Sequence, residues 1–235
     1  MSIVFKAAAT LRWNSAPLLV VTINVSGLPK EASRGARRNQ YDMADKIEAV
    51  REIMDNIAAW AGRPVDIAFM VETLLIKGQG MSMHGYHAEH AYRTDGAKIT
   101  GTDQSKPGGG VTALIREAHH HNQTVVRVNS HANALRNAAR QLQSVLWLQV
   151  AQEGGGYVYT GGTHLTGDKY LRPRGSSQKD GAAQLASHVA HYAGKGRVML
   201  LGDLNLTPGT KLIEVIRRAG KMDYLSPLLP THWAY

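Results

Sequence analysis

The chain has 235 residues, 43% hydrophobic and 19% charged, a composition typical of a globular protein and not of a disordered one. Its formal net charge of +9 favours a polyanionic partner, because Lys and Arg side chains bind phosphate and release counterions. The absence of cysteine excludes disulfides and thiolate metal sites, so any metal ion must be bound by oxygen or imidazole ligands.

The first predicted elements form a strand, helix, strand unit. Residues 18–25 are a β-branched apolar run that indicates a buried strand. Apolar residues then recur at helical spacing over residues 43–58, which predicts an amphipathic helix. A second apolar run at 65–71 predicts another buried strand. We expect the ends of the two strands, which carry Asn24 and Glu72, to lie close together.

The middle of the chain has weaker patterns. Residues 77–110 are rich in Gly, His and polar residues, and we interpret them as loops and short strands. An apolar strand is predicted at 111–115. The polar stretch 118–124 contains three consecutive histidines and is interpreted as a solvated turn without a functional role, because adjacent imidazoles diverge. Residues 133–143 fit a short helix and a strand equally well.

The last third of the chain again alternates strands with helices. Residues 144–151 and 157–165, separated by a glycine-rich turn, predict a β-hairpin. A helix is predicted over 177–192, a short strand over 197–201 and a final helix over 208–219. This alternation, without visible repeats, predicts a single layered α/β domain.

Polar residues stand where four of the predicted strands end. They are Asn24, Glu72, His164, and Asp203 with Asn205 two positions later. Layered α/β folds place their functional sites at strand ends. Asp203 and Asn205 can point the same way from an extended segment and contact one phosphate or metal-bound water. Taken singly, a Gly-Asp pair is more often a turn, and His164 a half-buried strand histidine.

Five segments, in this order and spacing, resemble the successive motifs of the endonuclease/exonuclease/phosphatase superfamily. They are 22–28 (TINVSGL), 66–74 (DIAFMVETL), 109–116 (GGVTALIR), 162–165 (GTHL) and 201–208 (LGDLNLTP). Each motif is weak alone, but the ordered set is not expected by chance. The resemblance implies one α/β domain over residues 1–235, a two-layer β-sandwich flanked by helices as in deoxyribonuclease.

The resemblance also implies a role for each strand-end residue. Glu72 matches the metal-binding glutamate of the family, and Asn24 the residue that orients it. Mg²⁺, with Mn²⁺ as a substitute, suits a site with so few carboxylates, because it takes water and phosphate oxygens as its other ligands. Asp203 matches the aspartate that positions or deprotonates the attacking water, and Asn205 the asparagine that holds the phosphate. His164 lies where the family has a histidine or tyrosine on the leaving side.

Two basic loops favour nucleic acid among the substrates of this superfamily. The candidate phosphate-binding residues in them are Lys30, Arg34, Arg37, Arg38, Lys169, Arg172 and Arg174. Residues 24–28 and 230–233 (PTHW) resemble the endonuclease domain of non-LTR retrotransposons. That resemblance implies DNA nicking, a nuclear location and a longer polyprotein with a reverse transcriptase. His164, where a tyrosine is common in that branch, resembles the deoxyribonuclease and phosphatase members instead.

The chain also departs from the family pattern at its end. It stops at Tyr235, before the final aspartate-histidine pair of the family, and His232 does not correspond to that histidine. The resemblance therefore implies that the closing strands are missing, which would expose a sheet edge and puts full turnover in question.

Other functions stay open at this stage. One is hydrolysis of a small or lipid phosphate, and another is binding of nucleic acid without catalysis. A basic surface that serves only solubility is a further alternative. The apolar run 16–25 is too short to span a membrane, and the first residues lack the pattern of a signal peptide. We therefore expect an intracellular protein that is not associated with a membrane.

Overall fold

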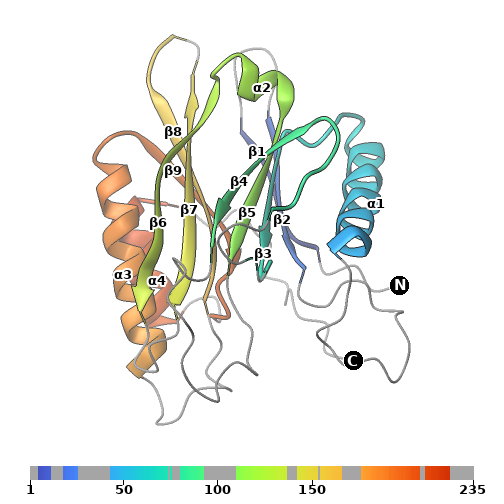
Figure 1. Ribbon diagram of the computed structural model, residues 1–235. Helices are drawn as coiled ribbons and strands as arrows, with labels where there is room; N and C mark the ends of the chain where they lie inside the picture. Colours follow the sequence, from blue (N-terminus) through green and yellow to red (C-terminus); the bar gives the residue numbers. More distant parts are fainter. Residues whose placement is uncertain are drawn as a thin grey trace, which may run out of the picture.

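Two β-sheets face each other and carry helices on their outer surfaces (Figure 1). The computed structural model describes residues 5–11, 18–25, 43–73, 75, 80–92, 110–136, 142–152, 154–165, 176–206 and 210–222. Their arrangement confirms the predicted α/β sandwich flanked by helices. A search of the helices within these ranges finds none with the length and apolar character needed to cross a membrane.

The first sheet contains five strands in the order β1-β2-β3-β5-β4. They are β1 (Phe5–Leu11), β2 (Leu18–Asn24), β3 (Ile67–Val71), β4 (Tyr86–Ala91) and β5 (Val111–Arg116). Strands β2 and β3 are parallel, and helix α1 (Met43–Ala61) connects them as predicted. Their register pairs Asn24 with Val71, so Asn24 and Glu72 lie at the same end of the sheet.

Helix α1 packs on the outer surface of this sheet through one face. The buried residues of that face are spaced by three or four positions, as in an amphipathic helix, and include Val50, Ile53, Met54 and Ile57. Burying a side chain of this size contributes about 1.5–3 kcal/mol. The helix begins at the end of the sheet where β2 and β3 end, and it runs back to the opposite end (Figure 1).

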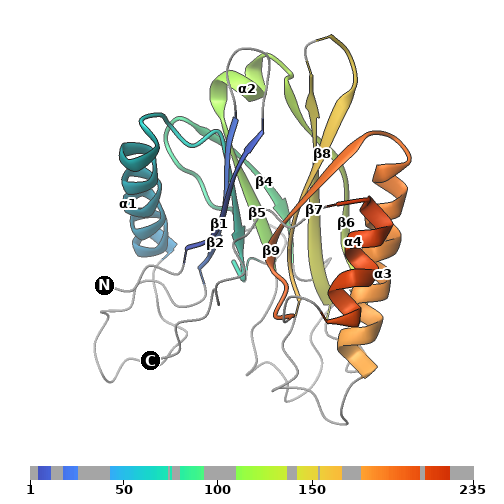
Figure 2. The same ribbon diagram turned by 180° about the vertical axis from the view of Figure 1, so that it is seen from behind.

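The second sheet contains four strands in the order β6-β7-β8-β9. They are β6 (Val125–Arg136), β7 (Leu142–Ala151), β8 (Tyr157–His164) and β9 (Arg197–Asp203). Strands β7 and β8 form the predicted hairpin, and β8 and β9 are parallel with His164 paired to Asp203. Helices α3 (Ser176–Ala193) and α4 (Lys211–Gly220) cover the outer face of this sheet (Figure 2).

Two glycines allow strands to approach closely beside these strand ends. A Cβ atom on Gly162 in β8 would lie 2.1 Å from the ring of Phe69 in β3, so the two sheets touch where a side chain would not fit. A Cβ atom on Gly202 in β9 would lie 1.8 Å from the carbonyl oxygen of Thr163, and Gly202 has a φ of 144°, which side-chain-bearing residues rarely adopt. The ends of β3, β8 and β9 converge as a result.

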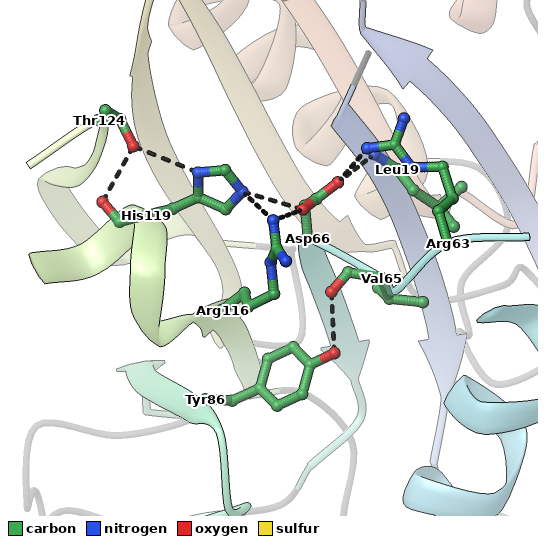
Figure 3. A network of polar contacts seen from close by, with 8 residues as sticks. All are labelled: Leu19, Arg63, Val65, Asp66, Tyr86, Arg116, His119 and Thr124. Atoms are coloured by element: carbon green, nitrogen blue, oxygen red, sulfur yellow. Dashed lines mark hydrogen bonds and ion pairs between the residues drawn. The ribbon is translucent and has the colours of Figure 1, made fainter. Parts of the chain in front are cut away.

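A buried carboxylate organises the opposite end of the first sheet (Figure 3). Asp66, directly before β3, has a side chain only 1% exposed. Its Oδ2 accepts hydrogen bonds from the backbone N–H of Leu19 and from Arg63, both at 2.8 Å. Its Oδ1 lies 2.8 Å from Arg116 Nη2 and 2.9 Å from His119 Nε2. One carboxylate therefore ties β2, β5 and the following helix to the start of β3.

Several elements differ from the sequence predictions. Strand β1 was not predicted, because its alanine-rich sequence has little intrinsic β preference, and it forms by antiparallel pairing with β2. Within the ambiguous segment 133–143, residues 133–136 and 142–143 are strand, while 137–141 lie outside the described residues. The stretch 118–124 is not a simple solvated turn, since α2 (Glu117–His121) is a short helix and presents His119 to Asp66. Helix α4 begins at Lys211, later than predicted.

Candidate functional site

The five strand-end residues lie together at one end of the sandwich. Asn24 ends β2 and Glu72 directly follows β3 in the first sheet. His164 ends β8, Asp203 ends β9 and Asn205 lies two residues further on in the second sheet. Each sheet contributes one parallel strand pair, and β9 packs against β2 and β3. Residues up to 181 positions apart in the chain therefore lie at one end of the sandwich, because the parallel strands of each sheet end at the same edge and the two sheets pack together there.

The Asp203 carboxylate is held by hydrogen bonds from both sheets. The side-chain amide of Asn24 donates to its Oδ2 at 3.2 Å, and the backbone N–H of Asn205 donates to its Oδ1 at 3.3 Å. Asp203 is only 8% exposed. With both oxygens engaged and little freedom to rotate, the carboxylate keeps a single orientation.

His164 lies between two carboxylates. Its Nε2 is 2.8 Å from Glu72 Oε1 and 3.9 Å from Asp203 Oδ2. The side-chain nitrogen of Asn205 is 3.0 Å from the same imidazole nitrogen and donates a hydrogen bond to the carbonyl oxygen of Leu165 at 2.7 Å. His164 is 7% exposed, so these contacts lie in a poorly hydrated region, where electrostatic interactions are stronger than in water.

The backbone is strained at two of the five positions. Glu72 and Asn205 have φ values of 59° and 48°, in the left-handed region that costs a residue other than glycine about 1 kcal/mol or more. Flanking hydrogen bonds hold Glu72 in this conformation, since Val25 N–H donates to Val71 O at 3.0 Å and Thr73 N–H to Gly110 O at 3.3 Å. Such strain is concentrated at sites where a side chain must be aimed out of a regular strand.

The donor set at this site suits a hard cation. Glu72 offers a carboxylate and Asn24 an amide oxygen, and both are oxygen donors of the kind that Mg²⁺ and Mn²⁺ accept. Within the described ranges, no three or more His, Asp and Glu side chains form a ready metal cage. Zn²⁺ usually takes three or four protein ligands, whereas Mg²⁺ takes one or two carboxylates with water and phosphate. Glu72 and Asn24 are therefore the described residues whose oxygen atoms could hold a divalent cation at this site.

The other predicted site residues belong to segments that the structure does not describe. The segment 230–233 lies outside the described residues, and so do the basic residues of the two loops. These basic residues are Lys30, Arg34, Arg37, Arg38, Lys169, Arg172 and Arg174. Sequence reasoning also overlooked Lys46, which is buried in the first turns of α1. Its signal was a charged residue four positions before Val50, where the helical pattern predicts an apolar one.

The fold of this chain is similar to that of several solved structures. No family model and no curated protein matches the sequence. ANGEL2, a 2′,3′-cyclic phosphatase, is 17% identical with a TM-score of 0.49, over 85% of this chain and 56% of that one. TDP2 from C. elegans is 17% identical with a TM-score of 0.48, over 80% and 47%. A β-hairpin deletion mutant of beta toxin from Staphylococcus aureus is 13% identical with a TM-score of 0.50, over 85% and 71%.

The chain thus spans about half the length of the ANGEL2 and TDP2 structures. All three proteins are members of the endonuclease/exonuclease/phosphatase superfamily. The structural similarity to beta toxin is consistent with the α/β sandwich of this chain, in which two facing sheets carry helices on their outer surfaces. This chain therefore has the fold of the endonuclease/exonuclease/phosphatase superfamily.

Proposed function

We propose that this protein is a metal-assisted phosphodiester hydrolase and that its substrate is DNA, which it nicks. The observation that supports hydrolysis is the meeting of two carboxylates, an imidazole and two amides at one end of the sandwich. His164 Nε2 and Asp203 Oδ2 lie 3.9 Å apart, so groups that can serve as base, acid and phosphate-holding donors are gathered in one place.

Asp203 is the proposed general base. Hydrogen bonds from Asn24 and from the backbone of Asn205 fix its carboxylate, so a water molecule bound to it would be held in one direction. A carboxylate in this position can accept the proton that the water loses as it attacks phosphorus.

His164 and Asn205 are proposed to act on the phosphate and the leaving oxygen. The Asn205 amide donates one N–H to the carbonyl oxygen of Leu165, and its second N–H, beside the imidazole, would stabilise negative charge on a phosphate oxygen. The His164 imidazole would donate a proton to the leaving oxygen. Glu72 and Asn24 would hold Mg²⁺, for which Mn²⁺ can substitute, and the ion would neutralise charge that develops on the phosphate.

DNA is the proposed partner on the basis of charge and sequence. The net charge of +9 and the two basic loops favour a polyanion over a small phosphate. The segments 24–28 and 230–233 favour a retrotransposon-type endonuclease, which would act in the nucleus as part of a longer polyprotein with a reverse transcriptase.

We expect the purified protein to convert supercoiled plasmid to open circles in Mg²⁺ and not in EDTA. Glu72→Gln removes the carboxylate charge and should raise the Mg²⁺ concentration for half-maximal rate by at least about tenfold. Nicking rates over a Mg²⁺ series measure this effect. The matched control is Glu117→Gln, an exposed carboxylate in α2 at the other end of the sandwich. Nicking that continues in EDTA would contradict a metal-assisted reaction.

Salt dependence separates DNA from a small phosphate substrate. If several Lys and Arg residues contact DNA phosphates, raising the salt concentration from about 50 to 200 mM should weaken binding at least about a hundredfold. Hydrolysis of a small phosphodiester such as bis-p-nitrophenyl phosphate should change little under the same conditions. Plasmid nicking that is insensitive to salt, with rapid hydrolysis of the small ester, would favour the small-phosphate alternative. Salt-sensitive DNA binding without any hydrolysis would favour a binding module.

A further inference from the structure

Lys46 is a buried lysine in the first turns of α1 and has no role in the proposed reaction so far. It is 7% exposed and belongs to the face of α1 that packs on the first sheet, four residues before Val50 and seven before Ile53. Every other buried side chain on that face among the described residues is apolar. The position is therefore one where packing alone would favour Leu or Met.

Two physical effects oppose a lysine at this position. Burial of an ammonium group removes its hydration, and the positive end of the helix dipole lies in the same turns. Burial lowers the pKa of Lys46, and the nearby Glu72 carboxylate opposes that decrease. The compensating negative charge therefore comes from a residue of the candidate site.

The location of α1 explains this proximity. Because α1 follows β2, it begins at the end of the sheet where Asn24 and Glu72 lie (Figure 1). Glu72 therefore interacts with groups from two layers. His164 Nε2 of the second sheet lies 2.8 Å from Glu72 Oε1, and the Lys46 ammonium group of α1 interacts with the Glu72 carboxylate electrostatically.

We propose that Lys46 is a positioning residue of this site, a fixed positive charge that balances Glu72 and favours binding of the substrate phosphate. The inference rests on the proposed function, and it adds a residue that the motif resemblance did not assign. A fixed positive charge has effects of opposite sign on the two ligands, because it repels a divalent cation and attracts a phosphate anion.

Lys46→Met tests this charge, since methionine keeps an unbranched side chain of similar length. We expect the variant to bind Mn²⁺ alone more tightly and inorganic phosphate alone more weakly, by roughly three- to tenfold each. Isothermal titration of the full chain with each ligand separately measures both values without turnover. Lys46→Arg should restore both affinities towards wild type, and Lys46→Gln provides a second neutral variant in case the Met variant does not fold.

Lys195→Met is the matched control, because Lys195 is exposed and follows α3 at the other end of the sandwich. It should leave both affinities unchanged. The Met variant should also melt at the wild-type temperature or above it, since it no longer buries a charge. A lower melting temperature with both ligands bound more weakly would indicate packing and overturn the inference. Equal affinities in wild type and Lys46→Met would also overturn it, whereas a wild type that binds no Mn²⁺ would overturn the proposed function itself.

Discussion

Asp203→Asn is expected to lower the rate of Mg²⁺-dependent plasmid nicking by about 10²–10⁴-fold, the range typical for loss of a general base. Asparagine has almost the same shape but cannot accept the proton of the attacking water. Its amide nitrogen would also face one of the two donors that now bind the Asp203 carboxylate, the Asn24 side chain at 3.2 Å or the Asn205 backbone N–H at 3.3 Å. Initial rates at saturating Mg²⁺ with increasing DNA concentration measure the effect as a loss in kcat.

The same samples provide the controls for Asp203→Asn. Glu117→Gln changes a carboxylate to an amide on the exposed surface of α2 and should nick at the wild-type rate. DNA affinity of Asp203→Asn should stay within about threefold of wild type, because loss of one base removes chemistry and not the phosphate contacts. If wild type and Asp203→Asn nick at equal rates, Asp203 is not the base and catalysis at this site is excluded.

Asp66→Ala is expected to lower the free energy of unfolding at neutral pH by about 3 kcal/mol, the effect of breaking a buried, multiply bonded ion pair. The change removes the acceptor of the buried Leu19 N–H and leaves Arg63, Arg116 and His119 without their shared carboxylate (Figure 3). Removing one partner of a buried ion pair costs about 3–5 kcal/mol. We expect the lower value because the side chains of Arg63 and Arg116 are 28% and 37% exposed and can be rehydrated.

The Asp66 contribution should depend on pH in a defined direction. Burial alone would raise the pKa of Asp66, but hydrogen bonds from His119 and Leu19, with the charge of Arg116, lower it below its ordinary value. A carboxylate with a lowered folded-state pKa contributes stability above its unfolded pKa, about 3.9, and that stability is lost as the pH falls through the folded value. The difference in free energy of unfolding between wild type and Asp66→Ala should therefore have its full value at pH 7 and decrease below about pH 4.

Urea unfolding followed by circular dichroism at pH 7, 4 and 3 measures this difference. Asp55→Ala, at an exposed position of α1, is the matched control and should change stability by less than about 0.5 kcal/mol. Equal effects of the two substitutions at pH 7 would refute the structural role of Asp66. A difference that grows towards acid would refute the lowered pKa. Because Asp66 lies at the far end of β3 from Glu72, nicking by folded Asp66→Ala protein should persist.

Local patterns were sufficient for most of the fold. The apolar runs of β2 and β3 and the helical spacing of α1 predict a strand, helix, strand unit with parallel strands, and that arrangement places Asn24 and Glu72 at one edge. The glycine-rich turn between β7 and β8 likewise predicts a β-hairpin, and the two strands pair antiparallel. The polar residues at strand ends could be singled out from the sequence because each one interrupts an apolar run.

The sequence by itself therefore determined the alternation of strands and helices in a layered α/β domain and the five polar residues at its strand ends, because hydrophobic periodicity is a local property. The sandwich of two sheets was implied by the motif resemblance and not by periodicity. Only the tertiary structure decided that β1 is a strand, that His119 binds Asp66 and that Lys46 lies near Glu72. Each of these depends on a partner distant in sequence or on another layer: β1 requires the edge of β2, and His119 requires a carboxylate 53 residues away. The helical spacing places Lys46 on the apolar face of α1, but it does not identify the Glu72 carboxylate, because folding brings that group beside it from another element.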